Sequence, residues 1–595
     1  MTKKGIKMYV NRRNFIGSSV ATMAVGLSCP AHAGEKPLLK VGFMTDTHVG
    51  TTKKSCERVK GAFEVFKAQG VDAVGHCGDL ADWHYVEGYK YYRETFEDVY
   101  PEGTKRPELL YVYANHDALD PTKKDPKLRQ QRVMDLATAF ADMRARLKID
   151  HGLFHQTTLG GIPFLVFPQT QKLIGGYGEV EKQVAAACAA HPTGPVVVLT
   201  HMAPAHTAYN SGEWGDAALR RIFSKYPRVV TFTGHTHGSL RNEQSVWQGE
   251  FTAVDVCCLQ EWHGISVGTP VAGKQAYGVV VAEFFANRIV LRRFDVRDGS
   301  EFKPEDPWVV TLPFAAATAP LNWETRAKTE PKAAFAAGSQ MTFTTDAVPF
   351  GSLKVSFPGA QAEEDVLSYR IEISRRKNGV WERFARNDVF GEFYLRPADR
   401  TGRYARSYPA IFFEADETYR FTVTPVGFFG ALGTPLEGEW TAPAKKPSKT
   451  ILLVEDPMDK LICRQGWPRS AQERQTAKPS RRDPEGWYLR DGGLNWFEMP
   501  EGVWQTKKGT HFRVAADLRV QQAPKIDGWC LRLSTADGTS RSACGWMTTP
   551  DGDAGLLRCV FEFDARVDDQ PNFALQLDRG GKGRFRLERL AIEND

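Results

Sequence analysis

Short apolar runs alternate with amphipathic stretches between residues 38 and 300, and this alternation constrains the fold more than any other feature of the chain. Short apolar runs bounded by polar turns indicate buried strands, whereas apolar residues spaced three and four apart indicate helices. Alternation of the two patterns is typical of an α/β domain. We expect strands at 38–44, 71–75, 109–113, 195–199, 228–232, 277–284 and 288–296, and helices at 56–69, 85–100 and 127–147.

A polar motif follows each of the first five of these strands. The motifs are Asp46-Thr47-His48, Gly78-Asp79, Asn115-His116-Asp117, His201 and Gly234-His235-Thr236-His237. Ligands of open α/β sheets bind beyond the carboxyl ends of the strands, so we expect the motifs to meet at one site. Any one motif is a weak signal, because single histidines and His-x-His pairs are common in cores and on surfaces. Five motifs in this order, each after an apolar strand, are a strong signal.

The combined donor set favours a pair of metal ions. It offers two carboxylates, one amide oxygen and four or five imidazoles, and it contains no thiolate. Iron, manganese and zinc accept such a mixture of imidazole and carboxylate donors. Two cations about 3.5–4 Å apart can clamp both the attacking and the leaving oxygen of an in-line displacement. Holding them so close needs an anionic bridge, which a carboxylate can provide.

With these motifs, residues 38–300 resemble the calcineurin-like metallophosphoesterase superfamily. The one departure within the motifs is Ala114, where the family usually has glycine. The resemblance implies a β-sandwich flanked by helices and two divalent or trivalent ions, either Fe, Mn or Zn. It implies that the first ion is held by Asp46, His48, Asp79 and His237. It implies that the second ion is held by Asp79, Asn115, His201 and His235.

The resemblance also implies catalytic roles for His116 and Asp117. His116 matches the family histidine that lies near the leaving-group oxygen, and Asp117 would orient it by accepting its other ring proton. A metal-bound hydroxide would then attack phosphorus in line with the ester oxygen. Purple acid phosphatases have a tyrosine three residues after the bridging aspartate, whereas this chain has Asp82. The pattern is therefore closer to cyclic-nucleotide phosphodiesterases and general phosphoesterases.

Two β-rich domains are expected after the α/β domain, which we place at residues 34–312. Linker-like compositions rich in Pro, Ala, Lys and Ser occur at 313–320 and 442–449. Residues 313–445 contain alternating runs that resemble a fibronectin type III module. Residues 446–595 resemble a carbohydrate-binding jelly roll, on architecture alone. The fold class expected is thus an α/β metallophosphoesterase sandwich followed by two all-β sandwich domains.

Residues 1–33 read as an export signal of the twin-arginine type. A basic segment with Arg12 and Arg13 precedes a short apolar run and the cleavage-like Ala31-His32-Ala33. This segment carries five of the six net positive charges, so the remainder is close to neutral, which argues against nucleic acid as a partner. We expect export to the periplasm or outside the cell, with no transmembrane segment in the mature chain.

The function expected is an exported dinuclear-metal phosphoesterase that hydrolyses phosphate mono- or diesters. The substrate class is a small-molecule or glycan-linked phosphoester, with carbohydrate contact by the last domain. One alternative is a glycan- or surface-binding protein with a vestigial phosphoesterase fold, and another is a nuclease of the same superfamily. Further residues weighed for the pocket are His84, His206 and Glu261-Trp262-His263, whereas His151 and His155 look structural.

Overall fold

The structure, a computed structural model, divides the chain into two compact units, Met1–Pro37 and Leu38–Asp595. It describes residues 35–50, 53–82, 86–118, 136–169, 174–260, 277–315, 319–346, 352–409 and 413–444, and short segments between 449 and 594. The predicted export signal lies outside the described residues. Within the described part of the chain, no helix is both long enough and apolar enough to cross a membrane.

Two six-stranded sheets form the first domain of the second unit. The first sheet has the order β12-β11-β10-β1-β2-β3, with β1, β2 and β3 parallel and β10 antiparallel to β1. Its strands are β1 (Leu39–Met44), β2 (Ala73–His76), β3 (Glu108–Tyr111), β10 (Gly278–Phe284), β11 (Arg288–Asp295) and β12 (Trp308–Thr311). The second sheet has the order β4-β5-β6-β7-β9-β8, with β5, β6, β7 and β9 parallel. Its strands are β4 (His155–Leu159), β5 (Ile162–Val166), β6 (Val196–Met202), β7 (Val229–Gly234), β8 (Val246–Gln248) and β9 (Thr252–Asp255).

The two sheets pack face to face around one apolar core. Phe43 of β1 stacks on Phe232 of β7 with ring centroids 3.6 Å apart. Valine, leucine and phenylalanine side chains from both sheets complete this core. The central parallel strands β2, β6 and β7 are buried on both faces, so they are largely apolar without alternation, as parallel strands in α/β proteins usually are.

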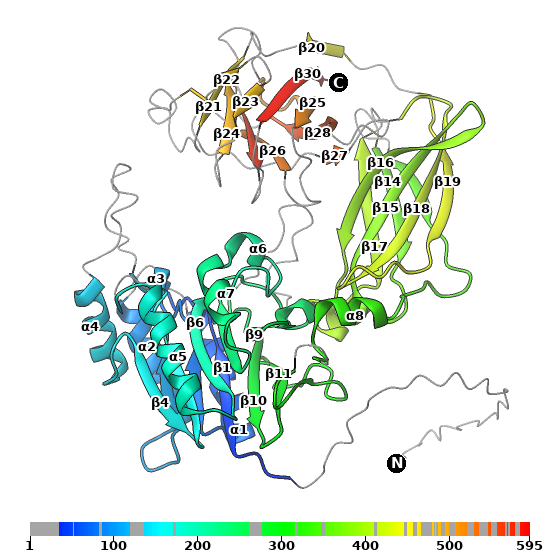
Figure 1. The fold of residues 1–595 in the computed structure, drawn as a ribbon. Helices are drawn as coiled ribbons and strands as arrows, with labels where there is room; N and C mark the ends of the chain where they lie inside the picture. The colour runs from blue at the N-terminus through cyan, green and yellow to red at the C-terminus, as the bar shows by residue number, and fades with distance from the viewer. Residues whose placement is uncertain are drawn as a thin grey trace, which may run out of the picture. The chain divides into compact units, whose positions relative to one another are not determined.

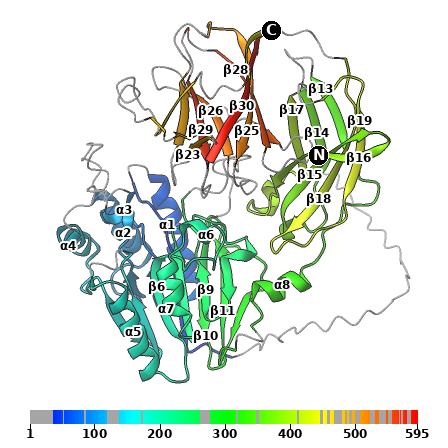
Figure 2. The ribbon, with the colours of Figure 1, turned by 45° about the horizontal axis from the view of Figure 1, so that its top comes forward.

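Helices cover the outer faces of both sheets (Figures 1 and 2). The first sheet is covered by α1 (Lys53–Gln69), α2 (Val86–Val99) and α4 (Leu136–Leu147). The second is covered by α5 (Tyr177–Ala190) and α7 (Ala217–Phe223). This arrangement confirms the predicted α/β sandwich flanked by helices. Residues 119–135, which include the first part of the helix predicted at 127–147, lie outside the described residues.

The segment after the first domain contains a helix that packs against that domain. This helix, α8 (Trp323–Thr329), lies just beyond the predicted linker, and the Trp323 indole donates a hydrogen bond to the carbonyl of Val246. Arg326 of the same helix forms an ion pair with the buried carboxylate of Glu243. Arg293, itself 1% exposed, also contacts Glu243 at 3.0 Å. These contacts attach α8 to the turn between β7 and β8.

A seven-stranded sandwich follows. Its three-stranded sheet contains β13 (Thr342–Asp346), β14 (Ser352–Pro358) and β17 (Arg403–Pro409), in that order. Its four-stranded sheet has the order β16-β15-β18-β19, with β15 (Val366–Lys377), β16 (Val380–Phe390), β18 (Thr418–Gly427) and β19 (Leu436–Thr441). Near the start of β18, the Tyr419 hydroxyl accepts a hydrogen bond from the amide of Glu414, the tyrosine-corner contact of Ig-like sandwiches. The fibronectin type III assignment itself stays a prediction.

The last part of the chain contains two further β-sheets. One sheet has the order β22-β23-β30-β25-β28-β27, with β20 also paired to β30, and the other has the order β21-β24-β29-β26. The strands are β20 (Lys449–Glu455), β21 (Ile462–Gln465), β22 (Arg482–Asp483), β23 (Gly486–Tyr488), β24 (Leu494–Glu498), β25 (His511–Val520), β26 (Trp529–Ser534), β27 (Trp546–Thr548), β28 (Leu556–Asp564), β29 (Asn572–Leu577) and β30 (Arg584–Asn594). The prediction of β-sandwich architecture after the first domain is confirmed, although helix α8 lies within the range predicted as all-β. A carbohydrate-binding role stays a prediction.

Candidate metal centre

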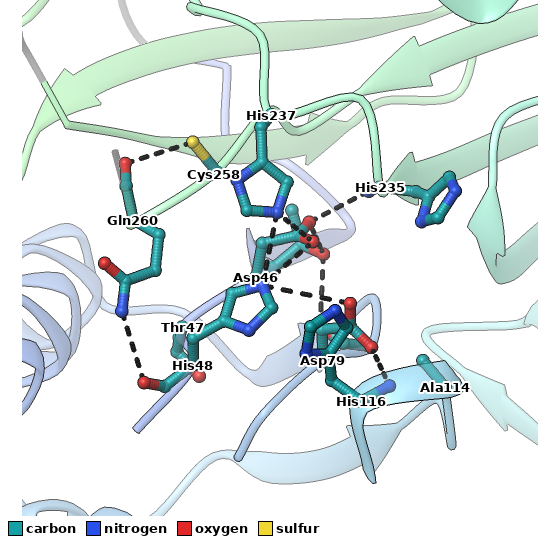
Figure 3. Close-up of polar contacts among 12 residues, drawn as sticks. Asp46, Thr47, His48, Asp79, Ala114, His116, His235, His237, Cys258 and Gln260 are labelled. Atoms are coloured by element: carbon teal, nitrogen blue, oxygen red, sulfur yellow. Dashed lines mark hydrogen bonds and ion pairs between the residues drawn. The ribbon is translucent and has the colours of Figure 1, made fainter. Parts of the chain in front are cut away.

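The five polar motifs come together at the carboxyl ends of strands from both sheets. Parallel strands end at the same edge of a sheet, so the loops after β1, β2 and β3 are neighbours, as are those after β6 and β7. Figure 3 shows the side chains of His48, His116 and His237 gathered around Asp46 and Asp79. Three groups of potential metal donors result, and the donor atoms of each group lie within 4.8 Å of one another. The groups are Asp46–His48–His237, His48–Asp79–His116 and Asp79–His201–His235.

Five residues of the cluster have left-handed backbone conformations. They are Asp46 (φ 49°), His48 (φ 40°), Asp79 (φ 53°), His235 (φ 69°) and His237 (φ 48°). Each such residue costs about 1–3 kcal/mol and persists only where its surroundings impose the conformation, and strain of this kind concentrates at functional sites. The tight loops allow side chains two residues apart to point into one cluster.

The first group places two imidazoles and a carboxylate around one point. The His237 Nε2 atom lies 3.1 Å from Asp46 Oδ1 and 3.1 Å from His48 Nε2. The other oxygen of Asp46 accepts hydrogen bonds from the amide of His235 and from the hydroxyl of Thr45. Asp46 therefore braces the loop after β7 with one oxygen and leaves the other to face the imidazoles.

The group Asp79–His201–His235 is built around His201. Its Nε2 atom lies 3.1 Å from Asp79 Oδ2 and 3.2 Å from His235 Nδ1. Its Nδ1 atom donates a hydrogen bond of 2.8 Å to the carbonyl of Cys77, so in the neutral tautomer the lone pair of Nε2 faces the cluster. Asp79 Oδ2 also lies 3.8 Å from His48 Nε2, so this carboxylate stands between the two groups.

The cluster has the chemistry of a site built for cations. Asp46 Oδ1 and Asn115 Oδ1 are buried and have no hydrogen-bond partner within the described residues. Leaving buried polar atoms without partners costs about 1–3 kcal/mol each, which a bound cation would remove. Facing imidazole nitrogens about 3 Å apart also need a shared cation or proton. Carboxylate oxygens, imidazoles and an amide oxygen fit Fe, Mn or Zn ions.

The electrostatics of the cluster lead to the same conclusion. Burial alone lowers an imidazole pKa, but the nearby carboxylates of Asp46 and Asp82 raise the pKa of His48 to about 9. In His201, burial is likewise outweighed by the charges of Asp79 and Asp46, which raise its pKa to about 9. Burial would raise the pKa of Asp79, but the charge of His201 holds it below its usual range. The carboxylates therefore create a strongly negative potential that attracts positive charge.

His116 forms a pair with Asp82, on the accessible side of the cluster. Its Nδ1 atom lies 2.9 Å from Asp82 Oδ1, and the two side chains are 25% and 40% exposed. Burial opposes ionisation of Asp82, but its hydrogen bonds to His116 and His48 lower its pKa to about 2. The amide of His116 donates to Asp79 Oδ1, which ties this loop to the centre of the cluster.

The expectation that Asp117 accepts the ring proton of His116 is corrected, because the structure gives this contact to Asp82. Asp117 is fully buried, and its carboxylate accepts hydrogen bonds from the amides of Leu80, Ala81 and Ala114. Burial, and then the charge of Asp79, raise the pKa of Asp117 to about 7. Asp117 thus joins the loops after β2 and β3. The sequence signal for Asp82 was its position three residues after Asp79.

The other residues weighed from the sequence divide into three sets. His206 is exposed and has a left-handed backbone (φ 61°) in the loop after β6. His151 and His155 stack on each other with ring centroids 4.6 Å apart, and His151 also stacks on Tyr111 of β3. His84 and Glu261-Trp262-His263 lie outside the described residues.

Sequence reasoning did not single out several residues that border the cluster. The Gln169 side chain accepts a hydrogen bond from the amide of Asn115. The Trp214 ring lies 5.6 Å from that of His235, between ring centroids. The Gln260 side chain donates to the carbonyl of His48. None of these three residues belongs to one of the five motifs, so only the folded structure shows that they lie beside the cluster.

Comparison with known proteins places the first domain in a family. Residues 39–239 match the family described as calcineurin-like phosphoesterase, so this part of the chain is a calcineurin-like phosphoesterase domain. Comparison with curated proteins finds no match.

Solved structures with similarity include phosphatases and a carbohydrate-binding domain. A dimetal phosphatase from Danio rerio is 10% identical, over 46% of this chain and 99% of that chain, with a TM-score of 0.32. Purple acid phosphatase PPD1 from yellow lupin (Lupinus luteus) is 16% identical, over 46% and 53%, with a TM-score of 0.32. The CBM22-1 xylan-binding domain of Xyn10C from Paenibacillus barcinonensis is 10% identical, over 25% and 97%, with a TM-score of 0.16. Nothing about activity follows from similarities of this size.

Cation binding should stabilise the first domain. A ligand present at about 1,000 times its Kd stabilises the folded state by about 4.1 kcal/mol, which raises Tm by on the order of 10 °C in a domain of this size. We expect Mn²⁺ to raise the Tm of the metal-free protein, measured by differential scanning calorimetry. Asp79→Asn should abolish most of the rise, whereas Asp72→Asn, a change at an exposed ion pair with Lys105, should retain it. A wild-type Tm that is unchanged by Mn²⁺, Zn²⁺ and Fe²⁺ would contradict the metal assignment.

Proposed function

We propose that this protein is an exported, dinuclear-metal phosphoesterase that hydrolyses phosphate mono- or diesters. The observation that carries the proposal is the position of Asp79. It belongs to the donor group Asp79–His201–His235, and its Oδ2 atom also lies 3.8 Å from His48 Nε2 of the group Asp46–His48–His237. A carboxylate in that position can bridge two ions. The calcineurin-like phosphoesterase domain at residues 39–239 supports the same reaction class.

The donor set assigns most residues to one of two ions. Asp46, His48, Asp79 and His237 would hold the first ion, and Asp79, Asn115, His201 and His235 would hold the second. When bound, Fe, Mn or Zn ions would supply Lewis-acid charge for the phosphoryl oxygens and lower the pKa of a water molecule. The protein's part is to hold these donors in a rigid, largely buried cluster.

His116 is the residue best placed to handle a proton at the leaving group. It is partly exposed, and it is tied to the centre through the bond from its amide to Asp79. Asp82 accepts the Nδ1 proton of His116, so it sets the tautomer and turns the ring. In the protonated ring, Nε2 can donate its proton to the ester oxygen as the bond to phosphorus breaks. Asp82 thus takes the positioning role expected of Asp117.

The substrate class and location rest on the sequence. A small-molecule or glycan-linked phosphoester fits an exported enzyme whose last domain would contact carbohydrate. The near-neutral charge outside residues 1–33 disfavours a nuclease, because nucleic-acid binding depends on basic residues that contact phosphates. The twin-arginine-type segment supports export to the periplasm or beyond, which would allow metal loading before export.

The rival proposal of a vestigial fold that serves only as a binding module is disfavoured by the donor set. Every candidate ligand and the His116–Asp82 pair are present, and Asp46 Oδ1 and Asn115 Oδ1 are buried with no hydrogen-bond partner among the described residues. Burying several ionisable groups together is costly unless they are paired, so a domain without metal function gains little from keeping them.

Removing a central ligand should abolish hydrolysis. Metal stabilisation of the transition state is worth several kcal/mol, so Asp79→Ala and His201→Ala should each lower kcat/KM by at least about 10³-fold. The assay uses p-nitrophenyl phosphate and bis-p-nitrophenyl phosphate, with metal content measured on the same samples. Asp142→Ala, at a surface ion pair of α4, serves as the control and should keep wild-type turnover. Near-wild-type turnover of either ester by both ligand variants would refute the proposal.

Asp82 should act through His116. His116→Ala should lower kcat by about 10²–10⁴-fold for an ester with a poor leaving group, and less for p-nitrophenyl esters. Loss of a hydrogen bond to a charged group, about 1.5–3 kcal/mol, predicts a loss of about 10–10²-fold for Asp82→Ala.

A double-variant cycle provides the test of this pathway. If Asp82 works only by orienting His116, the double variant should be no slower than His116→Ala alone. Metal content should be retained in all three proteins. Additive losses in the cycle would show that Asp82 acts on something other than His116.

A further inference from the structure

Two threonines occupy matching places in the loops that carry four candidate ligands. Thr47 lies between Asp46 and His48, and Thr236 lies between His235 and His237. In both loops, the residues on either side of the threonine have left-handed backbones. Both threonines are 1% exposed. The two loops follow β1 and β7, which belong to different sheets, so the same local pattern occurs at two separate places in the fold.

A directed set of hydrogen bonds anchors Thr47. The amide of Gly78 donates to His76 Nδ1, so in the neutral ring the proton is on Nε2. His76 Nε2 lies 3.1 Å from the Thr47 hydroxyl and can donate to it, and the hydroxyl in turn donates to the carbonyl of Leu80 at 2.8 Å. Because His76 ends β2 and Leu80 follows Asp79, these bonds join the loop after β1 to the loop that carries the central carboxylate.

A buried carboxylate anchors Thr236. The Thr236 hydroxyl donates to Asp255 Oδ2 at 2.7 Å, and the amide of Cys257 donates to Asp255 Oδ1 at 2.8 Å. Asp255 is 1% exposed and ends β9, the strand next to β7, where it lies opposite Thr233. The loop that carries His235 and His237 is therefore fastened to the adjacent strand of its own sheet.

We infer that Thr47 and Thr236 are positioning residues, whose hydroxyl bonds hold the two ligand loops in their left-handed form before cations bind. This inference rests on the proposed metal centre. Neither threonine belongs to the donor groups, and both hydroxyls bond to groups outside them. Without these anchors, the two strained residues of each loop could relax, and cation binding would have to restore the loop geometry.

The expected consequence is on cation affinity more than on the chemical step. Partners that orient metal ligands typically contribute 10–100-fold to metal affinity or activity. If the anchors act by preorganisation, their loss lowers affinity by about this factor. Once both ions are bound, the ligands regain their places and turnover returns close to the wild-type value.

The test compares isosteric substitutions in the full chain. Thr47→Val and Thr236→Val remove the hydroxyl and keep the branched shape. Thr47→Ser and Thr236→Ser keep the hydroxyl. Thr231→Val is the matched control, because Thr231 of β7 is fully buried and its hydroxyl has no hydrogen-bond partner within the described residues. Each metal-free protein is titrated with Mn²⁺ by isothermal calorimetry, and kcat is measured at saturating Mn²⁺.

We expect each of the two loop valine variants to bind Mn²⁺ about 10–100-fold more weakly, with kcat at saturation close to wild type. The serine variants and Thr231→Val should bind as the wild type does. Unchanged affinity in both loop valine variants, or an equal loss in the serine variants, would overturn the inference. If a valine variant does not fold, the corresponding alanine variant, which cannot clash, is held to the same expectation. A wild-type protein that binds no cation would instead refute the proposed function, so the two failures are distinguishable.

Discussion

The carboxylate of Asp79, held between two groups of imidazoles, is the constraint on which the rest of the first domain depends. Asp46 and Asp79 are almost completely buried, and burying ionised carboxylates is costly unless positive charge compensates them. In the metal-free chain, His48 and His201 provide that charge by keeping their protons, which their raised pKa values reflect. A pair of cations would replace those protons with stronger and more localised charge. The same electrostatic demand that destabilises an empty cluster therefore favours a loaded one.

The fold meets this demand by bringing two sheets together at their carboxyl ends. The face-to-face core, with Phe43 stacked on Phe232, sets the distance between the loop after β1 and the loop after β7. Five residues of the cluster keep a left-handed backbone because the packed core and the hydroxyl bonds of Thr47 and Thr236 impose that conformation. Asp117 contributes at a third place, where its carboxylate binds amides of the loops after β2 and β3. Rigid surroundings thus place the donors without requiring a ligand to organise them.

The two β-rich parts of the chain differ in their relation to the candidate metal site. Helix α8 is attached to the turn after the His235–His237 loop through the buried Glu243, which also contacts Arg293. The residues that lead into the seven-stranded sandwich therefore contact the first domain at Glu243, six residues after the candidate ligand His237. The last β-sheets contribute no described residue to the donor groups. Their proposed contact with carbohydrate would affect where the proposed phosphoesterase acts, and its chemistry would remain in the first domain.

The sequence by itself determined seven strands of the first domain and the candidate donor set. Continuous apolar runs predicted strands such as β1, β6 and β7, because a strand covered on both faces has few polar positions. The motifs directly after those strands identified the candidate ligands, because the end of a parallel strand is a fixed place in an α/β sheet. Short strands such as β4, with its alternating exposure, and the helix α5 were not predicted. Their patterns are weak in isolation, and packing on neighbouring strands stabilises them.

Only the tertiary structure decided which residues support the ligands. Asp82, and not Asp117, accepts the ring proton of His116, although both aspartates lie close to a motif residue in sequence. Asp255 and His76 anchor their threonines across 19 and 29 residues of sequence. Hydrogen-bond partners are chosen by distances of about 3 Å, which depend on loop geometry and on the packing of two sheets. Strand patterns carry no information on such distances. The sequence therefore predicted the candidate ligands, but it did not predict which residues hydrogen-bond to them and to their loops.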